Sequence, residues 1–373
     1  MLSLDNMKKV QSFDKVFLGI TLLLAFAGIF IFTSASFGLL FRKGFSFQDL
    51  LFGQIVLGLV LGIVVMIIMY RIPLKWLREY SLHIFIASLL LTLLVFVPHI
   101  GFDQIKGAHR WIAVGPFSFQ PSEALKLGAV IYFAALLPLF KSRMGSLKNI
   151  LLIFSGVLVL PAIILLLEPD TGTLIVLFLT LVAMLLAAGM KIRQLLLLFG
   201  LSVLMVGALA VVRPYVRERI LTFFDSSRDP QGASYQIQKS LLSIGSGGIT
   251  GRGFGQSIQK FGSLPEPTGD SIFAVAGEEF GFIGAAALIL LFLVFGIRGI
   301  QIAQRSPDMF SGLLAVGIVI LIVSQSFANI AAMLGLVPLT GVPLVFVSHG
   351  GTALLFAFLE IGILLNISKL SHI

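Results

Sequence analysis

The sequence predicts an all-α polytopic membrane protein of about ten transmembrane helices, and three observations support this fold class. The 373-residue chain is 58% hydrophobic and 12% charged, whereas soluble domains are about half apolar and a quarter charged. Apolar runs of roughly 20 residues, the length needed to cross a bilayer as a helix, recur along the chain. Basic residues gather in alternate loops. The chain has no cysteine, which excludes disulfides, cysteine nucleophiles and thiolate metal sites.

The apolar runs define the helices in order. The first follows a short basic stretch and has no small-residue cleavage site after it, so we interpret it as a retained membrane helix and not as a signal peptide. Only "LEPDTG" separates the fifth run from the sixth. The predicted spans are residues 16–38, 50–70, 81–100, 123–140, 149–167, 172–190, 194–212, 271–297, 310–331 and 351–368.

The charges predict the topology. With both termini on one side, the short segments of that side hold fourteen of the 26 lysines and arginines. The short loops opposite hold four: Arg42, Lys43, Lys106 and Arg110. Positive charge in short loops marks the cytoplasm. Both termini are therefore expected inside, and residues 213–270, between helices 7 and 8, form a large extracytoplasmic loop within a single transmembrane domain spanning 1–373. The net charge of +9 indicates contact with anionic lipid more than with nucleic acid.

The predicted outer loops hold most of the polar motifs. In "GAHRWIAVGPFSFQPSEALK", Arg110 and Trp111 could anchor the chain at the membrane–water interface. Alternatively they could contact substrate, in which case Arg110 would bind a phosphate. Ser122 is a candidate N-cap for the fourth helix. Glu123 and Lys126 share a helix face and could form a structural ion pair. A lysine inside a span usually faces a cavity or a partner, so Lys126 is also a candidate phosphate ligand.

Two further outer segments carry charge. In "EPDTGT", Asp170 is expected to cap the sixth helix, next to Glu168. The loop 213–270 begins with "RPYVRERI", whose arginines suit lipid headgroups. It continues with Arg228, Lys239, Ser257 and Lys260 among glycines. No Gly-Lys-Ser/Thr follows these glycines, so the pattern is not a nucleotide-binding loop. It predicts a backbone that approaches another surface closely, flanked by cations.

Four carboxylates follow in "SLPEPTGDSIFAVAGEEFGFIG". Asp270 could cap the eighth helix, or it could serve with Glu266 as a base at the membrane edge. Glu278 and Glu279 lie about 12 Å deeper, at 1.5 Å per residue. At that depth we expect structural roles, such as pairing with Lys126 or bonding helix ends.

The last motif, "PLTGVPLVFVSHGG", contains Ser348 and His349. Its prolines and glycine break a helix at membrane depth, which is tolerated where the segment is buried or lines a cavity.

These motifs together resemble the SEDS family (shape, elongation, division, sporulation), whose members are ten-helix proteins that polymerise lipid II into peptidoglycan. The FtsW division-type branch fits better than the RodA elongation-type branch, because Glu168 heads "EPDTGT" and because of the glycine spacing in "GRGFGQSIQK". The resemblance places Asp270 on the family's essential acid and Glu266 on a motif glutamate. Thr268, Gly269 and Ser271 depart from the family pattern.

The resemblance implies a peptidoglycan glycosyltransferase in the bacterial cytoplasmic membrane, with its active site on the outer face, acting at the division septum. Asp270 would be the general base. Implied partners are lipid II, undecaprenyl pyrophosphate, a class B penicillin-binding protein and other division proteins. No cofactor is expected beyond a divalent cation, Mg²⁺ or Mn²⁺, that could assist. A lipid II flippase and a noncatalytic division scaffold remain as alternatives. The implied substrate-binding residues are Arg110, Trp111, Lys126, Arg228, Lys239, Ser257, Lys260 and Ser348.

Overall fold

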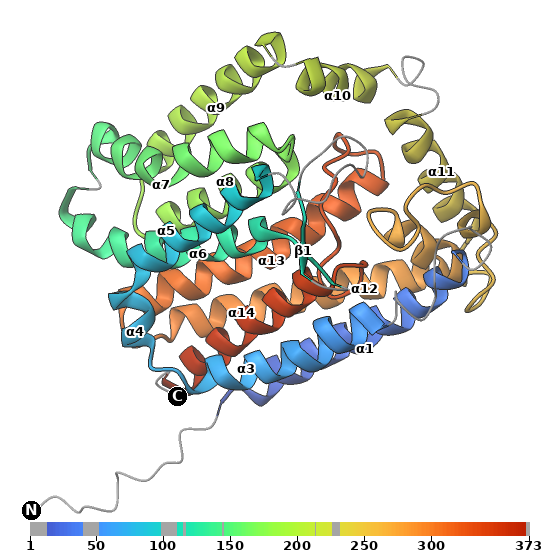
Figure 1. Cartoon of the computed structure of the whole chain (residues 1–373), viewed down its shortest axis with the longest axis horizontal. Helices are drawn as coiled ribbons and strands as arrows, with labels where there is room; N and C mark the ends of the chain where they lie inside the picture. The colour runs from blue at the N-terminus through green and yellow to red at the C-terminus, as the bar shows by residue number, and fades with distance from the viewer. Residues whose placement is uncertain are drawn as a thin grey trace, which may run out of the picture.

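The computed structural model describes residues 13–39, 52–97, 110–114, 117–143, 145–212, 214–225 and 232–370, and shows a bundle of long helices (Figure 1). The first half comprises α1 (Lys15–Phe37), a π-helical turn η2 (Gly53–Val60) continuing into α3 (Leu61–Arg71), α4 (Leu74–Glu79), α5 (Ser81–Leu93), η3 (Leu94–Phe96), β1 (Ile112–Val114), β2 (Phe117–Phe119), α6 (Pro121–Leu136), η4 (Leu137–Arg143) and α7 (Leu147–Leu167). The second half comprises α8 (Thr171–Ala187), α9 (Ile192–Val212), α10 (Pro214–Phe224), α11 (Ala233–Ser246), η5 (Gln259–Phe261), α12 (Ile272–Gln304), α13 (Met309–Met333) and α14 (Gly351–Leu370).

The predicted membrane fold is confirmed. Seven helical segments in the described ranges are long and apolar enough to cross a membrane, and three shorter apolar helices, Ser81–Phe96, Thr171–Ala187 and Ile192–Gly207, match the remaining predicted spans. The start of α1 lies beside the end of α14, because the Asp14 amide donates to Ser368 Oγ at 3.1 Å. The sequence analysis did not anticipate the small antiparallel hairpin of β1 and β2, in which Ile112 pairs with Phe119.

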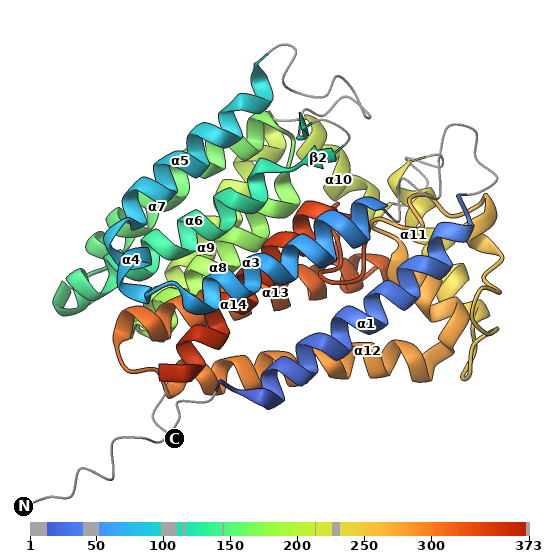
Figure 2. The same cartoon turned by 60° about the horizontal axis from the view of Figure 1, so that its bottom comes forward.

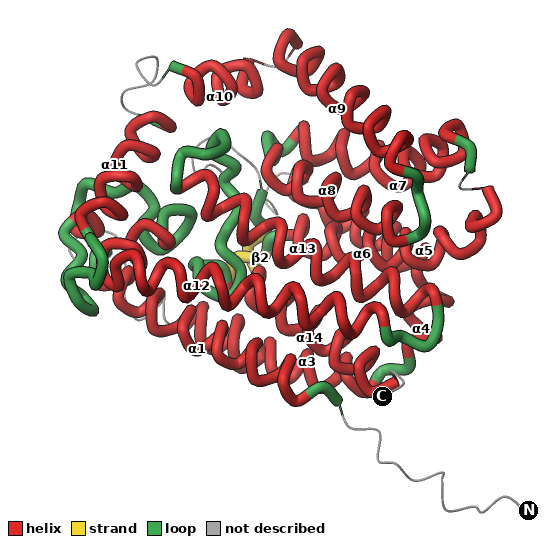
Figure 3. Tube along the Cα trace, turned by 180° about the vertical axis from the view of Figure 1, so that it is seen from behind, coloured by secondary structure: helices red, strands yellow, loops and turns green. Residues whose placement is uncertain are grey.

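Helices α13 and α14 form the centre of the bundle. In the most apolar stretch of each of these two helices, two thirds of the residues are buried. The buried share in the corresponding stretches of α1, α3, α7 and α12 is 22–39%. The outer helices therefore turn apolar side chains outward, as a lipid-facing surface requires. Figure 2 shows α1 and α12 side by side beneath this centre. Seen from behind in Figure 3, α9, α10 and α11 run around the outside of the bundle.

Two irregular segments position the polar residues. The broken segment, residues 334–350, connects α13 to α14 without helix, as its prolines and glycine predict. It is packed so tightly against α1 that a Cβ on Gly28 would lie 2.1 Å from the carbonyl oxygen of Phe346. The acidic turn, residues 263–271, leads into α12 and carries Asp270. Most residues of both segments are buried or half-buried, in accord with the behaviour of non-helical backbone in membranes.

The glycine-rich loop, residues 247–256, packs on a kink in α12. Gly281 has φ 63° and ψ −164°, and the amides that follow the kink bond to the loop: Phe282 N donates to Gly248 O at 2.9 Å. In return Arg252 N and Gly253 N donate to the carbonyls of Glu278 and Glu279. The predicted close approach of this glycine run is therefore to the backbone of α12 in the same chain.

The helix caps differ in part from the predictions. Asp170 caps α8, accepting from Thr173 N at 3.2 Å. The prediction for Ser122 is wrong, because α6 begins at Pro121 with Gln120 in the N-cap position. Proline suits the first helical position, since its missing N–H would have no partner there. Ser271, and not Asp270, occupies the N-cap position of α12, with no side-chain capping bond.

Candidate active site

The acidic turn is held onto the broken segment by two hydrogen bonds, and a third within the broken segment orients Ser348. The Ser348 hydroxyl donates to Gly269 O at 2.8 Å and accepts from Leu344 N at 2.9 Å. The His349 amide donates to Thr268 O at 2.6 Å. Ser348, one of the implied substrate-binding residues, therefore fixes the backbone beside Asp270.

Asn329 of α13 bonds to both the acidic turn and the broken segment. Its Nδ2 donates to Asp270 O and to Val342 O, each at 2.9 Å. One buried amide thus fixes the backbone that carries the acid and the backbone opposite it. The Asp270 side chain itself is half-buried, so it is held in place and still reachable.

Arg219 of α10 reaches the same place. A Cβ built on Gly341 would lie 3.8 Å from Asp270 Oδ2 and 3.6 Å from Arg219 NH2. Arg219 NH1 also donates to Thr171 Oγ1 at 3.2 Å and to Thr340 O at 3.3 Å. A carboxylate and a guanidinium therefore converge over Gly341, whose φ of +68° and missing side chain leave room for both.

The sequence analysis missed Arg219, because it assigned the arginines of "RPYVRERI" to lipid headgroups. The signal is weak in the sequence: Arg217 and Arg219 are alike by composition. Only burial separates them, since Arg217 is exposed and Arg219 is half-buried.

Glu266 belongs to the acidic turn, and its charge acts on His349 of the broken segment. Glu266 is exposed and has a φ of +45°, which is rare for a residue with a side chain. His349 has an exposed edge and stacks on Phe32 with ring centroids 5.8 Å apart. Burial lowers the pKa of His349 below its usual value, and the charge of Glu266 opposes this change in part.

Arg110 holds the turn between α7 and α8. Its Nε donates to Glu168 O at 3.1 Å, and its NH2 donates to Pro169 O. Burial and the neighbouring Asp170 raise the pKa of Glu168 to about 8, although Arg110 acts in the opposite direction. Because Arg219 bonds Thr171 on the same turn, Arg110 and Arg219 approach one edge of the molecule together.

Lys126 lies deeper, in a polar cluster between α6, α13 and α14. Its Nζ contacts Glu123 Oε1 at 2.9 Å and Gln325 Oε1 at 2.5 Å. With Glu360 these residues line a cavity of about 10 Å³, which has room for about one water molecule. Lys126 is therefore the partner of Glu123 in this structure, and the space around it is too small for a diphosphate.

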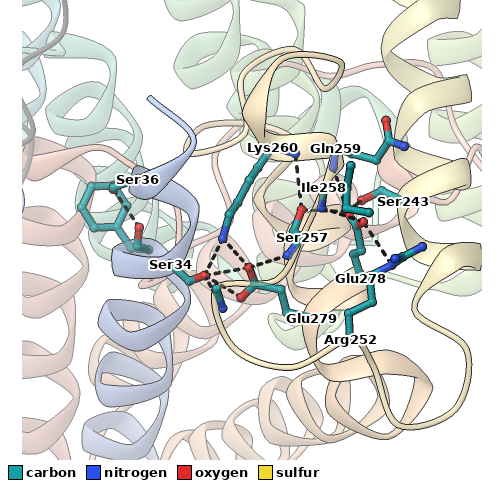
Figure 4. Close-up of polar contacts among 12 residues, drawn as sticks. Ser34, Ser36, Ser243, Arg252, Ser257, Ile258, Gln259, Lys260, Glu278 and Glu279 are labelled. Carbon is teal, nitrogen blue, oxygen red and sulfur yellow. Dashed lines mark hydrogen bonds and ion pairs between the residues drawn. The ribbon is translucent and has the colours of Figure 1, made fainter. Parts of the chain in front are cut away.

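Glu278 and Glu279 are fully buried beneath the glycine-rich loop (Figure 4). Glu279 accepts from Lys260 Nζ at 2.6 Å and from Ser34 of α1. The predicted pairing of these acids with Lys126 is wrong, because Lys126 lies on a different side of the bundle core with Glu123. In the structure Glu279 pairs with Lys260, and Glu278 pairs with Arg252, whose Nε lies 3.4 Å from Glu278 Oε1.

Ser257 and Lys260 belong to this buried network and do not reach the acidic turn's surface. The Ser257 hydroxyl donates to Glu278 Oε2 at 2.7 Å, as does that of Ser243 at 2.8 Å. The Lys260 side chain is 0% exposed. The resemblance implied that these two residues bind substrate. In the structure their side chains instead bond to Glu278 and Glu279 of α12 (Figure 4).

The remaining candidates are distributed as follows. Lys239 Nζ lies 5.3 Å from the centre of the Tyr235 ring, on α11, and Gln236 of that helix donates to Ser271 Oγ at 3.0 Å. Trp111 is half-buried just before β1. Arg228 lies outside the described residues. Within the described ranges, no three histidine or carboxylate side chains gather into a metal-binding set, so we derive no step through the expected divalent cation.

Comparison with known proteins gives consistent results. A profile of the FtsW/RodA/SpoVE family, described as cell cycle proteins, matches residues 14–373. Stage V sporulation protein E of Bacillus subtilis is 36% identical over 371 residues, covering 98% of this chain and 99% of its own. A probable peptidoglycan glycosyltransferase FtsW of Geobacter metallireducens is 37% identical over 369 residues, covering 97% and 96%.

Solved structures share the fold. One chain, from a study of how a peptidoglycan synthase complex coordinates polymerization and crosslinking, is 26% identical with a TM-score of 0.79, covering 96% of this chain and 98% of its own. The rod shape determining protein RodA of Thermus thermophilus is 24% identical with a TM-score of 0.66, covering 98% of each chain.

Proposed function

This chain belongs to the FtsW/RodA/SpoVE family of cell cycle proteins, the SEDS family, and from that membership we propose that it is a peptidoglycan glycosyltransferase that polymerises lipid II into glycan strands. Relatives that cover nearly all of the chain are named as probable enzymes of this activity. The division-type role is the finer part of the proposal. FtsW-named relatives support it, and a sporulation protein of similar identity is the alternative within the family.

One observation carries the catalytic part of the proposal: Asp270 and Arg219 converge over Gly341. A half-exposed carboxylate can accept a proton from a sugar hydroxyl. A guanidinium a few ångströms away can bind the phosphate oxygens of a leaving diphosphate with two parallel hydrogen bonds. Glu266, exposed on the same turn, lies at the rim, where it can orient the acceptor sugar.

The reaction that these groups would serve is a single inverting displacement. The 4-hydroxyl of the acceptor's N-acetylglucosamine attacks the anomeric carbon of the donor's N-acetylmuramic acid. The new C–O bond forms as the bond to undecaprenyl pyrophosphate breaks, and its electron pair leaves on the pyrophosphate oxygen. Asp270 takes the hydroxyl proton. The α-linkage of the donor becomes a β-linkage in the product.

The cations divide by position. Lys126 and Lys260 are buried in ion pairs, so we assign the diphosphate to Arg219 first, with Arg110 on the same α7–α8 turn and Lys239 on α11. Preorganised cations stabilise the charge that develops on a leaving group. We place this site and residues 213–270 on the outer face of the bacterial cytoplasmic membrane, at the division septum.

We also propose a class B penicillin-binding protein as the partner. A solved relative belongs to a complex that combines polymerization with crosslinking. A transpeptidase that receives the growing strand directly would supply the second of these activities here. Lipid II and undecaprenyl pyrophosphate would be the substrate and the released carrier.

The test is polymerisation of labelled lipid II by the purified full-length chain with its transpeptidase partner. Asp270→Asn should abolish the glycan ladder while the protein keeps its helix content and melting temperature. Asp308→Asn is the matched control, because it makes the same chemical change far from Asp270. Asp308 is the N-cap of α13, a position where asparagine still caps the helix. Ladders of normal length from Asp270→Asn would remove Asp270 from the base role.

The buried polar cluster around Lys126 is the one observation that favours a flippase instead. A transporter needs a path through the membrane, and this cluster lies inside it. Its cavity of about 10 Å³ is far smaller than a disaccharide, however, so the described conformation supports the enzyme. Translocation of lipid II in vesicles by the Asp270→Asn chain, without polymerisation, would support the flippase.

A further inference from the structure

A second polar cavity lies at the opposite end of the bundle from Asp270. It has a volume of about 430 Å³ and is formed where α3 ends, α4 follows, α13 begins and α14 ends. In Figure 2 this is the end of the bundle near the C-terminal label and α4. Its size is within the range of small-molecule sites, roughly 300–1,000 Å³. Nothing in the proposed reaction uses it.

The cavity is strongly basic. Arg71, Lys75, Arg78 and Lys369 line it, together with a single acid, Asp308. The Asp308 carboxylate is engaged as the N-cap of α13, accepting from the amide and the hydroxyl of Ser311 at 3.1 and 2.8 Å. Among the residues that the structure describes, no carboxylate pairs with any of the four cations. The first turn of α13, which also faces the cavity, adds the positive end of a long helix.

The walls are fixed before any ligand binds. Asn366 Nδ2 donates to Met69 O at 3.0 Å and to Ile72 O at 2.6 Å, which ties the end of α14 to the end of α3. Lys369 Nζ lies 5.5 Å from the centre of the Tyr70 ring. Because the pocket is already formed, an anion that binds to its cations loses little free energy in ordering the surrounding side chains.

The depth of the cavity matches the lipid headgroups. Met309 and Asn329 are twenty residues apart on α13, so the cavity and the Asp270 site lie about 30 Å apart along that helix, which is the thickness of a bilayer's hydrocarbon core. Beside the cavity, Trp76 of α4 is 61% exposed and Tyr80, which follows that helix, is 50% exposed. Such aromatic residues mark the membrane–water interface. The cavity also has apolar lining, with Phe310 and Leu370 among its residues.

We propose that this cavity, at the end of the bundle where α1 begins and α14 ends, binds the phosphate of an anionic phospholipid headgroup. The phosphate would lie among Arg71, Lys75, Arg78 and Lys369, with the glycerol and upper acyl chains against the apolar wall. Basic pockets between membrane helices favour such headgroups over zwitterionic ones. This site is independent of the polymerase proposal, since it shares no residue with it.

The chain's two tryptophans permit a direct test. Trp111→Phe leaves Trp76 as the sole fluorophore, next to the cavity. The full-length protein is reconstituted in phosphatidylcholine with a low fraction of brominated lipid, either phosphatidylglycerol or phosphatidylcholine. We expect brominated phosphatidylglycerol to quench Trp76 with at least about tenfold higher apparent affinity. In detergent, added phosphatidylglycerol should also raise the melting temperature, by mass action on the folded state.

Two matched variants decide the assignment. Arg71→Gln/Lys75→Gln/Arg78→Gln should abolish both the quenching preference and the melting shift, with unchanged helix content. Lys148→Gln/Lys191→Gln/Arg193→Gln removes the same charge from exposed positions at the start of α7 and around the start of α9, outside the cavity, and it should retain both. Equal behaviour of the two triple variants would overturn the site. Displacement of the lipid by millimolar inorganic pyrophosphate would overturn the lipid assignment and make the ligand a soluble phosphate.

Discussion

Replacing Lys260 with methionine separates a structural lysine from a substrate-binding one. Lys260 Nζ lies 2.6 Å from Glu279 Oε1, and both side chains are 0% exposed. Methionine fills nearly the same volume but leaves the Glu279 carboxylate buried with the Ser34 hydroxyl and the Ser257 amide as its remaining donors. Breaking a buried pair by removing one partner costs about 3–5 kcal/mol.

The measurement is thermal unfolding of the purified chain in detergent, alongside polymerisation at a temperature where both forms are folded. For a chain of this length that loss corresponds to a fall in melting temperature on the order of 5 °C. Adding Glu279→Gln should restore most of the stability, because glutamine keeps an oxygen for Ser34 and Ser257 and removes the unpaired charge. A Lys260→Met chain of normal stability that fails to polymerise lipid II would refute this reasoning and return Lys260 to the diphosphate.

Three further predictions concern the site, the loop and pH. Arg219→Gln should lower the polymerisation rate by about 10²-fold, through lost stabilisation of the leaving group, whereas the exposed neighbour Arg217→Gln should not; equal losses in initial-rate assays would contradict the assignment. Gly251→Ala should lower the unfolding free energy by about 3 kcal/mol, because its Cβ would lie 2.2 Å from a carbonyl of α12. Gly255→Ala, with a similar φ but open space, should cost about 1–2 kcal/mol in the same unfolding experiment. Glu168 keeps its proton up to about pH 8 when folded, against 4.5 as its usual pKa, so its contribution to stability should be full below pH 4.5 and be lost as pH rises to 8; Glu168→Gln should flatten that part of the stability profile, and an unchanged slope in melting temperature would count against the pKa shift.

The role of a candidate residue could be predicted from the sequence when its bonding partner lies a few residues away, and could not when the partner lies far along the chain. Asp170 was predictable as a cap, because its partner, Thr173 N, is three residues away. Ser122 was misplaced as a cap because the helix begins at Pro121, two residues before the position at which a helix capped by Ser122 would begin. Asp270 was found through its motif, but its neighbour Arg219 lies 51 residues earlier in the sequence. No local pattern relates two such positions.

The sequence alone determined the membrane class, nine of the ten spans to within a few residues and the position of the acidic motif, because hydrophobicity, helix length and turn chemistry act over neighbouring residues. The exception is α12, which continues to Gln304, seven residues past its predicted end at residue 297. The Lys126–Glu123 pair lies within one helix and could be predicted from its spacing of three residues. The tertiary structure alone decided the pairings between distant segments: Lys260 with Glu279, and Arg219 over Gly341 beside Asp270. Helices separated by many residues choose their neighbours by packing, and a buried charge takes the partner that packing brings within about 3 Å.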